Sequence, residues 1–189
     1  MALLEVSDLS FGYTNEALFS GVAIKLEAGE RAALVAPNGA GKSTLLRVLA
    51  GELEQDKGFV VPKKGAKLGY YRQSHEVKAA GSVMDALLSG FGELVAIRHA
   101  LTAAQEAAAS GTPSALAKLA ELDEQYHRAG ADALERRVQA IAGRLGFAER
   151  DLERDVRTLS GGERGRLSLG VVLAGEPEIL MLDEPTNHL

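Results

Sequence analysis

The sequence contains no cysteine, and this absence removes two classes of structure. Without thiols the chain has neither a disulfide framework nor a cysteine-based metal site, so a reducing compartment suits it. No apolar run approaches the length that spans a bilayer, and residues 1–5 lack the charged and apolar regions of a signal peptide. We therefore expect a cytoplasmic protein that reaches any membrane only through a partner.

Positive charge is also in deficit, because 21 Lys and Arg against 26 Asp and Glu give a net charge of −5. This balance argues against a surface that coats nucleic acid, although a local basic patch stays open. The rest of the composition, 46% hydrophobic and 25% charged, is ordinary for a globular protein. With 189 residues the chain has room for one α/β domain, or for a domain and a fraction.

The sequence is organised around a glycine-containing loop that joins a strand to a helix. Residues 32–35 are apolar and predict a buried parallel strand, while the spacing of apolar residues 45–49 predicts a helix that ends at Gly51. The loop reads Ala36-Pro37-Asn38-Gly39-Ala40-Gly41-Lys42-Ser43-Thr44. Its N–H groups and the helix N-terminus predict a nest for phosphate oxygens. The alternative is an ordinary strand-to-helix turn.

Each residue type in this loop suits a bound nucleotide. Gly39 and Gly41 permit positive φ and let phosphate oxygens come close. Lys42 supplies a charge for the outer phosphates, and Ser43 supplies a hydroxyl for Mg²⁺. Ala36 replaces the first glycine of the G-x-x-x-x-G-K-[ST] pattern, which is tolerable if its φ stays negative.

Two further candidates flank the loop in sequence. Alternating residues predict strands within 3–35, and Tyr13 lies in a turn-rich stretch between two of them. Its ring is suited to stack on a purine, or else it is a half-buried hairpin tyrosine. After the loop, residues 59–62 and 66–71 predict strands, and the second ends near Gln73. This glutamine reaches a metal or an attacking water, or is simply a polar loop residue.

Residues 83–147 follow a helical pattern with two breaks. The first break contains Pro113, which ends one helix, and Ser114, which is suited to cap the next; the second is at Gly130. Residues 93–129 therefore predict an antiparallel helical hairpin. Three Lys or Arg against five Asp or Glu make it slightly acidic, which indicates an ordinary solvated face.

A further helix opens with Leu159-Ser160-Gly161-Gly162-Glu163. Ser160 and Glu163 alone satisfy a Ser-x-x-Glu capping box. Two glycines in a first helical turn cost about 1 kcal/mol each against alanine. This cost makes sense if a phosphate approaches the backbone closely at the positive end of the helix dipole.

Two acids follow the apolar run 179–182, which predicts a buried strand. Asp183 and Glu184 lie at its carboxyl end, where ligands bind in open α/β sheets. Asp183 suits the Mg²⁺ shell, and Glu184 is placed to polarise an attacking water. The alternative is a pair of solvated acids.

Taken in order, these motifs resemble those of an ATP-binding cassette (ABC) domain. The loop at 36–44 resembles the Walker A motif, Gln73 the Q-loop glutamine, and residues 159–163 the signature motif. Residues 179–184 resemble Walker B with its catalytic glutamate, and Tyr13 the A-loop aromatic.

The subfamily resemblance is narrower. Walker B continues as Pro185-Thr186-Asn187-His188-Leu189, which is similar to the ABC-F proteins. These are soluble twin-cassette ATPases, many of which act on the ribosome. The hairpin would match their arm, and Glu163 in place of the transporter-typical glutamine also fits. The chain thus resembles the first cassette of an ABC-F protein.

The resemblance implies an α/β fold of the P-loop NTPase type, the ABC nucleotide-binding domain. It implies an N-terminal antiparallel β subdomain and an inserted α-helical subdomain. Residues 1–82 would hold the β subdomain and the P-loop part of the core, and 83–158 the helical subdomain with its arm at about 93–129. Residues 159–189 would hold the signature helix and the Walker B strand.

ATP and Mg²⁺ are the implied ligands. The resemblance assigns Mg²⁺ to Ser43, Gln73 and Asp183, and catalysis to Glu184 with Lys42 and Gln73. The nucleotide contacts would be Tyr13, Asn38, Gly39, Ala40, Gly41, Lys42, Ser43, Thr44, Ser160, Gly161, Gly162 and Glu163. The last four would cover ATP that is held by a second cassette.

Three functions stay open. The first is an ABC-F ATPase that hydrolyses ATP to ADP and phosphate with a second cassette and acts on the ribosome. The second is the ATP-hydrolysing subunit of a membrane transporter, and the third is a non-catalytic module that binds nucleotide without turnover.

The family's D-loop aspartate and switch histidine would follow Leu189. We therefore expect a C-terminally truncated core whose sheet lacks a strand between residues 32–35 and 179–182. These 189 residues alone are then expected to be unstable, completed by a strand from a partner, or rearranged around residues 179–182, and to be inactive.

Overall fold

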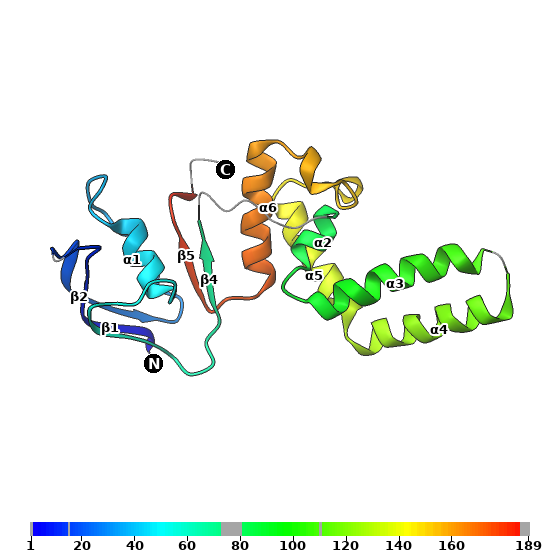
Figure 1. Cartoon of the computed structure of the whole chain (residues 1–189), viewed down its shortest axis with the longest axis horizontal. Helices are drawn as coiled ribbons and strands as arrows, with labels where there is room; N and C mark the ends of the chain where they lie inside the picture. Colours follow the sequence, from blue (N-terminus) through cyan, green and yellow to red (C-terminus); the bar gives the residue numbers. More distant parts are fainter. Residues whose placement is uncertain (1, 15, 73–80, 110, 186–189) are drawn as a thin grey trace. The chain divides into compact units, whose positions relative to one another are not determined.

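A computed structural model shows the chain as two compact units (Figure 1). The structure describes residues 2–14, 16–72, 81–109 and 111–185. Of these, residues 2–72 and 175–185 belong to the first unit, and residues 81–174 belong to the second. Each unit has its own hydrophobic core.

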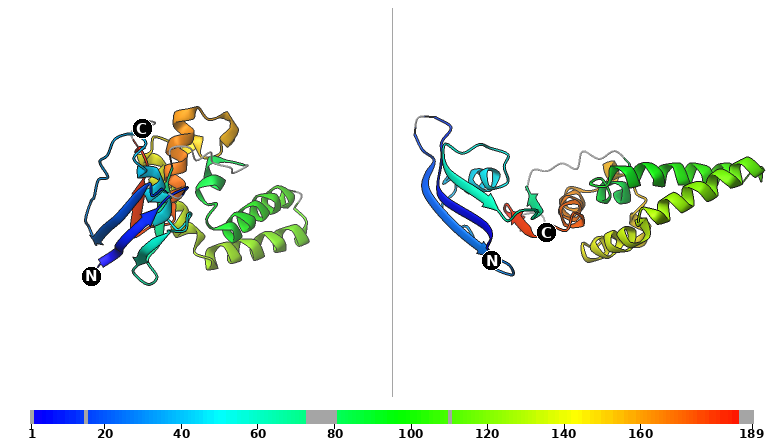
Figure 2. Two further views of the ribbon diagram at one scale, coloured as in Figure 1. Left: turned by 60° about the vertical axis from the view of Figure 1, so that its left-hand side comes forward. Right: turned by 90° about the horizontal axis from the view of Figure 1, so that it is seen from below.

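The first unit contains a three-stranded antiparallel sheet, visible in both views of Figure 2. Strand β1 (Ala2–Phe11) lies between β2 (Phe19–Glu27) and β3 (Lys57–Pro62), so the order is β2-β1-β3. In β2 the apolar side chains at alternate positions are half-buried while Ala23 and Lys25 are exposed. The predicted N-terminal antiparallel sheet is confirmed.

Strands β4 (Leu68–Tyr71) and β5 (Ile179–Leu182) form a separate parallel pair in the same unit. Tyr71 is paired with Leu182, so both strands end at the same edge. In β5 only alternate residues are buried, because Leu180 and Leu182 remain about 40% exposed. The prediction of a fully buried strand at 179–182 is therefore wrong for one face.

Helix α1 (Lys42–Leu49) follows the glycine-containing loop as predicted. Its buried residues Leu45, Val48 and Leu49 join the core formed by β1 and β5. The helix ends where Gly51, at φ 75°, donates its N–H to the Val48 carbonyl. This is the left-handed glycine that the sequence predicted.

Residues 32–35 do not form the predicted buried strand. They have no strand assignment and are exposed, with Val35 exposed to 92%. In the described ranges, no backbone hydrogen bond joins them to β4, β5 or another strand. An extended apolar segment becomes a strand only beside a partner that satisfies its N–H and C=O groups.

The second unit is helical. It contains α2 (Val83–Leu87), α3 (Gly92–Ala108), α4 (Pro113–Arg128), α5 (Ala131–Arg144) and α6 (Gly161–Ala174), with single 3₁₀ turns η1 (Glu149–Asp151) and η2 (Val156–Thr158) between the last two helices. Figures 1 and 2 show α3 and α4 side by side as an antiparallel hairpin. The predicted hairpin at 93–129 is confirmed within one residue at each end.

The start of α4 differs from the prediction. Pro113 is the first helical residue, and Thr112 is the N-cap, so Ser114 does not cap the helix. Proline suits the first helical position because its missing N–H would have no partner there and its φ is already helical. Pro113 thus starts the second helix rather than only ending the first.

The core of the second unit brings α6 against α2 and α5. Gly170 of α6 lies where a Cβ would approach Leu87 to 2.7 Å and Leu145 to 2.9 Å. No helix within the described ranges is long and apolar enough to cross a membrane. The division of the chain at residues 82 and 158 stays a prediction.

Candidate functional site

Two glycines of the loop have the positive φ that the sequence predicted. Gly39 and Gly41 have φ of 82° and 89°, and Gly41 is the N-cap of α1. A Cβ at position 41 would also lie 2.9 Å from the Leu18 side chain, so glycine is needed there for space as well. Ala36 does not have a positive φ, which is the condition under which alanine is expected to be tolerated in place of the first glycine.

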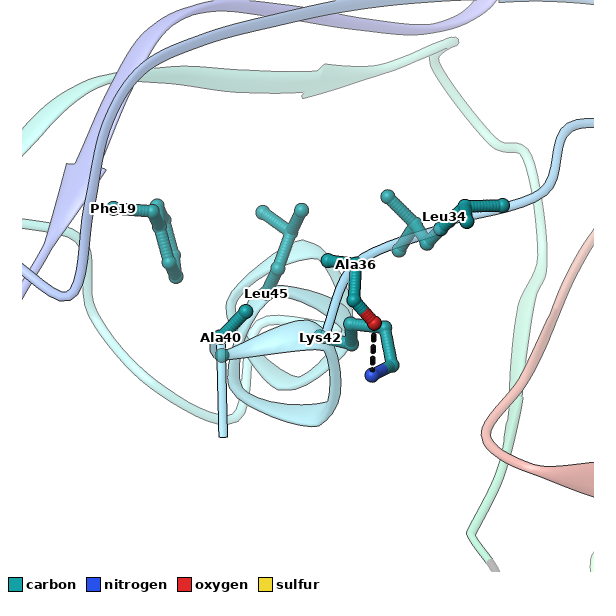
Figure 3. Close-up of a pocket in the computed structure, with 8 residues that line it drawn as sticks. Phe19, Leu34, Ala36, Ala40, Lys42 and Leu45 are labelled. Carbon is teal, nitrogen blue, oxygen red and sulfur yellow. Dashed lines mark hydrogen bonds between the residues drawn. The ribbon is translucent and has the colours of Figure 1, made fainter. Parts of the chain in front are cut away.

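Lys42 folds back over this loop, as Figure 3 shows. Its Nζ donates hydrogen bonds to the carbonyl oxygens of Ala36, at 2.9 Å, and of Pro37, at 3.1 Å. The ammonium group therefore lies against the carbonyl oxygens of the loop that precedes α1. Both carbonyls are neutral acceptors, which an anionic phosphate can replace.

A cavity of about 90 Å³ lies beside the loop. It is lined by Phe19, Leu34, Val35, Ala36, Ala40, Gly41, Lys42 and Leu45. Ligand pockets in proteins are typically about 300–1,000 Å³, so this cavity is too small for a nucleotide. Phosphates would instead contact the open face of the loop, where residues 36–40 are exposed.

The structure brings Asp183 to the start of α1. The Ser43 hydroxyl donates a hydrogen bond to Asp183 Oδ1 at 3.0 Å, although 140 positions separate the two residues. The backbone N–H of Asp183 bonds to the Tyr71 carbonyl and continues the β4–β5 pairing. Two potential metal ligands, the Ser43 hydroxyl oxygen and an Asp183 carboxylate oxygen, thus lie together at the carboxyl edge of the parallel strands.

These donors fit Mg²⁺, which takes hard oxygen ligands, needs only one or two protein groups and keeps several waters. Across the described ranges, no group of three or more His, Asp or Glu side chains gathers that would hold a metal alone. The site therefore suits a metal that arrives with phosphate oxygens.

Tyr70 is a residue that the sequence reading did not single out. Its hydroxyl donates a hydrogen bond to Asp183 Oδ2 at 3.4 Å. Burial, followed by the nearby Asp183 carboxylate, raises the pKa of Tyr70 to about 12. The Tyr70 hydroxyl is therefore protonated at neutral pH and donates its hydrogen bond to the Asp183 carboxylate. Only its place one strand residue before the end of β4 would have pointed to it.

Tyr13 lies next to the loop, on the connection between β1 and β2. Its hydroxyl is 3.4 Å from Thr44 Oγ1, and its ring forms a T-shaped pair with Phe11 at a centroid distance of 5.0 Å. The residue is 63% exposed. This exposure disfavours the interpretation of a half-buried hairpin tyrosine, and the stacking of Tyr13 on a base stays a prediction.

Glu184 follows Asp183 at the end of β5 and has an unusual backbone, with φ at 46°. Positive φ is uncommon in a glutamate, but Asp8 and Glu176 share it, so the catalytic role of Glu184 stays a prediction. Gln73 lies outside the described residues. The pairing of Tyr71 with Leu182 nevertheless brings the described ends of the two strands to the same edge.

The Ser160–Glu163 segment belongs to the second unit and opens α6. The Ser160 N–H donates to Glu163 Oε2 at 2.7 Å, and the Glu163 N–H donates to Ser160 Oγ at 3.3 Å. The capping box is confirmed. Hydrogen bonding to Ser160, and then to Arg154 at 2.9 Å, lowers the pKa of Glu163 to about 2.

The two glycines of this segment have no packing role in the second unit. A Cβ at Gly161 would meet nothing within 4 Å, and one at Gly162 only the Arg166 guanidinium at 3.6 Å. Internal packing thus leaves their cost unexplained, in contrast to Gly170. The approach of a phosphate to the backbone at this helix N-terminus therefore stays a prediction.

Comparisons with known proteins agree with this geometry. The sequence model described as "ABC transporter" matches residues 19–187. The uncharacterized ABC transporter ATP-binding protein YfmM of Bacillus subtilis is 36% identical over 193 residues, which cover 100% of this chain and 37% of YfmM. The tylosin resistance ATP-binding protein TlrC of Streptomyces fradiae is 38% identical over 182 residues, 94% of this chain and 33% of TlrC.

ABC transporter F family member 5 of Arabidopsis thaliana is 32% identical over 194 residues, 98% of this chain and 28% of the plant protein. The chain thus spans about a third of the length of these curated relatives. Among solved structures, CbiO1 from Clostridium perfringens, part of the ABC transporter complex cbiONQ, superposes with a TM-score of 0.62 at 23% identity. The match covers 100% of this chain and 67% of that one.

Proposed function

The chain belongs to the ABC transporter family of ATPases, and from this premise we propose that it binds Mg-ATP and hydrolyses it together with a second cassette. We further propose that the protein is of the ABC-F kind and uses ATP to act on the ribosome. The cassette proposal depends on the first unit, and the ABC-F proposal on the second.

One observation carries the cassette proposal. The Ser43 hydroxyl and the Asp183 carboxylate lie 3.0 Å apart, beside a loop in which Gly39 and Gly41 have positive φ and Lys42 bonds to the Ala36 carbonyl. A glycine-containing loop alone, or an aspartate alone, would not indicate a nucleotide site. Here the two lie together at the carboxyl edge of parallel strands, which is where open α/β sheets bind ligands.

The chain's own residues then have these roles. Lys42 exchanges its carbonyl partners for phosphate oxygens, and the first N–H groups of α1 hold the same phosphates. Tyr13 stacks on the base. Ser43, Asp183 and Gln73 would hold Mg²⁺, which neutralises charge on the phosphates when it is bound. Glu184 orients the attacking water and accepts its proton on a carboxylate oxygen.

Catalysis of this kind is mainly positioning and charge stabilisation, and part of it comes from another cassette. Ser160, Gly161 and Gly162 present exposed or half-exposed backbone at the start of α6. We propose that they cover the phosphates of ATP held by that second cassette. The open spaces around both glycines support this proposal.

The hairpin of α3 and α4 favours the ABC-F kind. It is an extended, slightly acidic pair of helices, and relatives include an F family member. The family-level alternative is a transporter subunit, since YfmM is named an ABC transporter ATP-binding protein and CbiO1 is part of a transporter complex. Co-sedimentation with ribosomes at low salt distinguishes the two, because an ABC-F protein trapped with ATP sediments with them and a transporter cassette does not.

Substitution of Lys42 tests nucleotide binding. Hydrogen bonds to charged groups contribute about 1.5–3 kcal/mol, so Lys42→Ala should weaken Mg-ATP binding by the full-length protein at least about tenfold. Titration calorimetry measures this. Lys64→Ala is the matched control, because Lys64 is an exposed lysine of the same unit outside the loop. Equal affinities of the Lys42 variant and the parent protein would refute the assignment.

A further inference from the structure

Arg98 of α3 joins the base of the hairpin to three other segments. Its guanidinium bonds to Asp85 Oδ1 at 2.8 Å, to Glu153 Oε1 at 2.5 Å and, through Nε, to Glu135 Oε1 at 3.5 Å. These acids lie on α2, on the connection between η1 and η2, and on α5 respectively. The Arg98 side chain is only 18% exposed. Three separate segments thus share one planar donor group.

This arrangement fixes an orientation as well as a contact. A guanidinium presents five N–H donors in a rigid fork, whereas a lysine ammonium is a single point charge. Hydrophobic side chains of similar volume stabilise a protein as well as a buried ion pair does. The expected contribution of Arg98 is therefore less to stability than to direction, because its bonds to Asp85 and Glu135 join α3 to α2 and α5.

Asp85 carries the connection into α2. Its carboxylate accepts from the Ser82 N–H at 3.1 Å, and its own N–H donates to Ser82 Oγ at 3.1 Å, so it completes the N-terminal cap of α2. His99 also approaches Asp85 Oδ1, at 3.1 Å. Burial favours the neutral acid, but the bonds from Ser82 and His99 and the charge of Arg98 outweigh it and lower the pKa of Asp85.

The start of α2 is in turn bonded to the segment that precedes α6. The Val83 N–H donates to the Arg154 carbonyl at 2.9 Å, and the Val156 N–H donates to the Gly81 carbonyl at 3.1 Å. Arg154 then bonds through Nη1 to Glu163 Oε1 at 2.9 Å. Glu163 is the residue that caps Ser160. Hydrogen bonds, joined by the backbone from Ser82 to Val83 and by the Arg154 residue itself, therefore connect Arg98 in the hairpin to Ser160.

We propose that Arg98 is a positioning residue that couples the α3–α4 hairpin to the Ser160–Glu163 segment, so that a partner that moves the hairpin also moves this segment. The effect on ATP turnover rests on the proposed function, whereas the mechanical coupling does not. Coupling requires that a change at Arg98 alters both the distance between the hairpin and α6 and the rate of ATP hydrolysis, so both are measured.

The first measurement is a distance between spin labels. The chain has no cysteine, so labels are introduced by Gln105→Cys on α3 and Arg164→Cys on α6, both exposed positions. The labels are placed in the full-length protein, in which any cysteine outside these 189 residues is first replaced. Arg98→Met should broaden the distance distribution about twofold or more, and Arg98→Lys should broaden it less.

Arg128→Met is the matched control, because the guanidinium of Arg128 bonds to Glu124 on the same exposed helix face. It should leave the distribution unchanged. An unchanged distribution in a folded Arg98→Met or Arg98→Lys variant would overturn the proposal. Arg98→Lys keeps the positive charge, so its distance distribution tests the proposal if Arg98→Met does not fold.

The second measurement is steady-state hydrolysis of ATP. Arg98→Met should lower kcat about fivefold or more with an unchanged KM, because it leaves the phosphate loop untouched. Arg154→Met should act alike, and the double variant should be no slower than the slower single variant. If the double variant lost kcat by the product of the two single losses, Arg98 and Arg154 would act independently, and the proposal would be overturned. A parent protein without ATPase activity would refute the proposed function and leave the spin-label result standing.

Discussion

Substitution of Gly58 tests the pairing of β1 with β3 in the sheet of the first unit. It lies in β3 with φ at 84°, opposite the point where β1 inserts one extra residue. A Cβ at this position would lie 2.4 Å from the carbonyl oxygens of both Ser7 and Asp8. These are backbone atoms, which cannot rotate away as a side-chain end would. Gly58→Ala therefore combines backbone strain with a clash.

The expected cost follows from these two contributions. Left-handed backbone costs a non-glycine residue about 1–2 kcal/mol, and forcing extra atoms into a packed site costs about 1–3 kcal/mol. Gly58→Ala should thus lower the free energy of unfolding by about 2–5 kcal/mol. That is a large part of the roughly 5–15 kcal/mol that stabilises a typical domain.

Gly65→Ala is the matched control. Gly65 has φ at 82°, but a Cβ there would meet nothing within 4 Å. It should cost only the strain, about 1–2 kcal/mol. Urea unfolding of the full-length protein, followed by circular dichroism, measures both. Equal losses in the two variants would refute the clash and with it the geometry of the β1–β3 bulge.

Two further predictions concern the candidate site. Ser43→Ala should raise the Mg²⁺ concentration that half-saturates ATP hydrolysis about tenfold or more. Tyr70→Phe should raise it only a few-fold, because the hydrogen bond from Tyr70 to Asp183 is long at 3.4 Å. A larger effect of Tyr70→Phe than of Ser43→Ala would contradict these roles. Glu163 has a depressed folded-state pKa, so its stabilising contribution is present above its usual value of 4.5 and is lost as pH falls toward about 2. Glu163→Gln should therefore lower Tm at neutral pH, and the difference from the parent protein should shrink below pH 4.5; a difference that grows on acidification would disprove the role of the carboxylate.

The fold class could be predicted from the sequence, and the ABC nucleotide-binding fold with its antiparallel sheet and helical region is confirmed. Local rules were sufficient for several features. Positive φ at Gly39 and Gly41, the capping box at Ser160, and the hairpin of α3 and α4 each depend on residues close together in sequence. Such features need little tertiary information.

What failed or was missed depends on distant partners. Residues 32–35 are apolar and extended, yet a strand exists only beside another strand. Tyr70 is significant because its hydroxyl meets Asp183, and Arg98 because α2 and α5 bring acids to it. Gly170 has the same explanation, since only the packing of Leu87 and Leu145 requires it. None of these contacts leaves a periodic signal in the sequence.

In the proposed function, Glu184 orients the water that attacks ATP. Comparison of the full-length protein with its Glu184→Gln variant tests this role, because the amide keeps the shape of the side chain and removes its charge. ATP binding by calorimetry should change less than about threefold, while hydrolysis should fall about a hundredfold or more, a barrier increase of roughly 2.7 kcal/mol. Hydrolysis within about twofold of the parent rate, a barrier change well below 1.36 kcal/mol, would contradict the account.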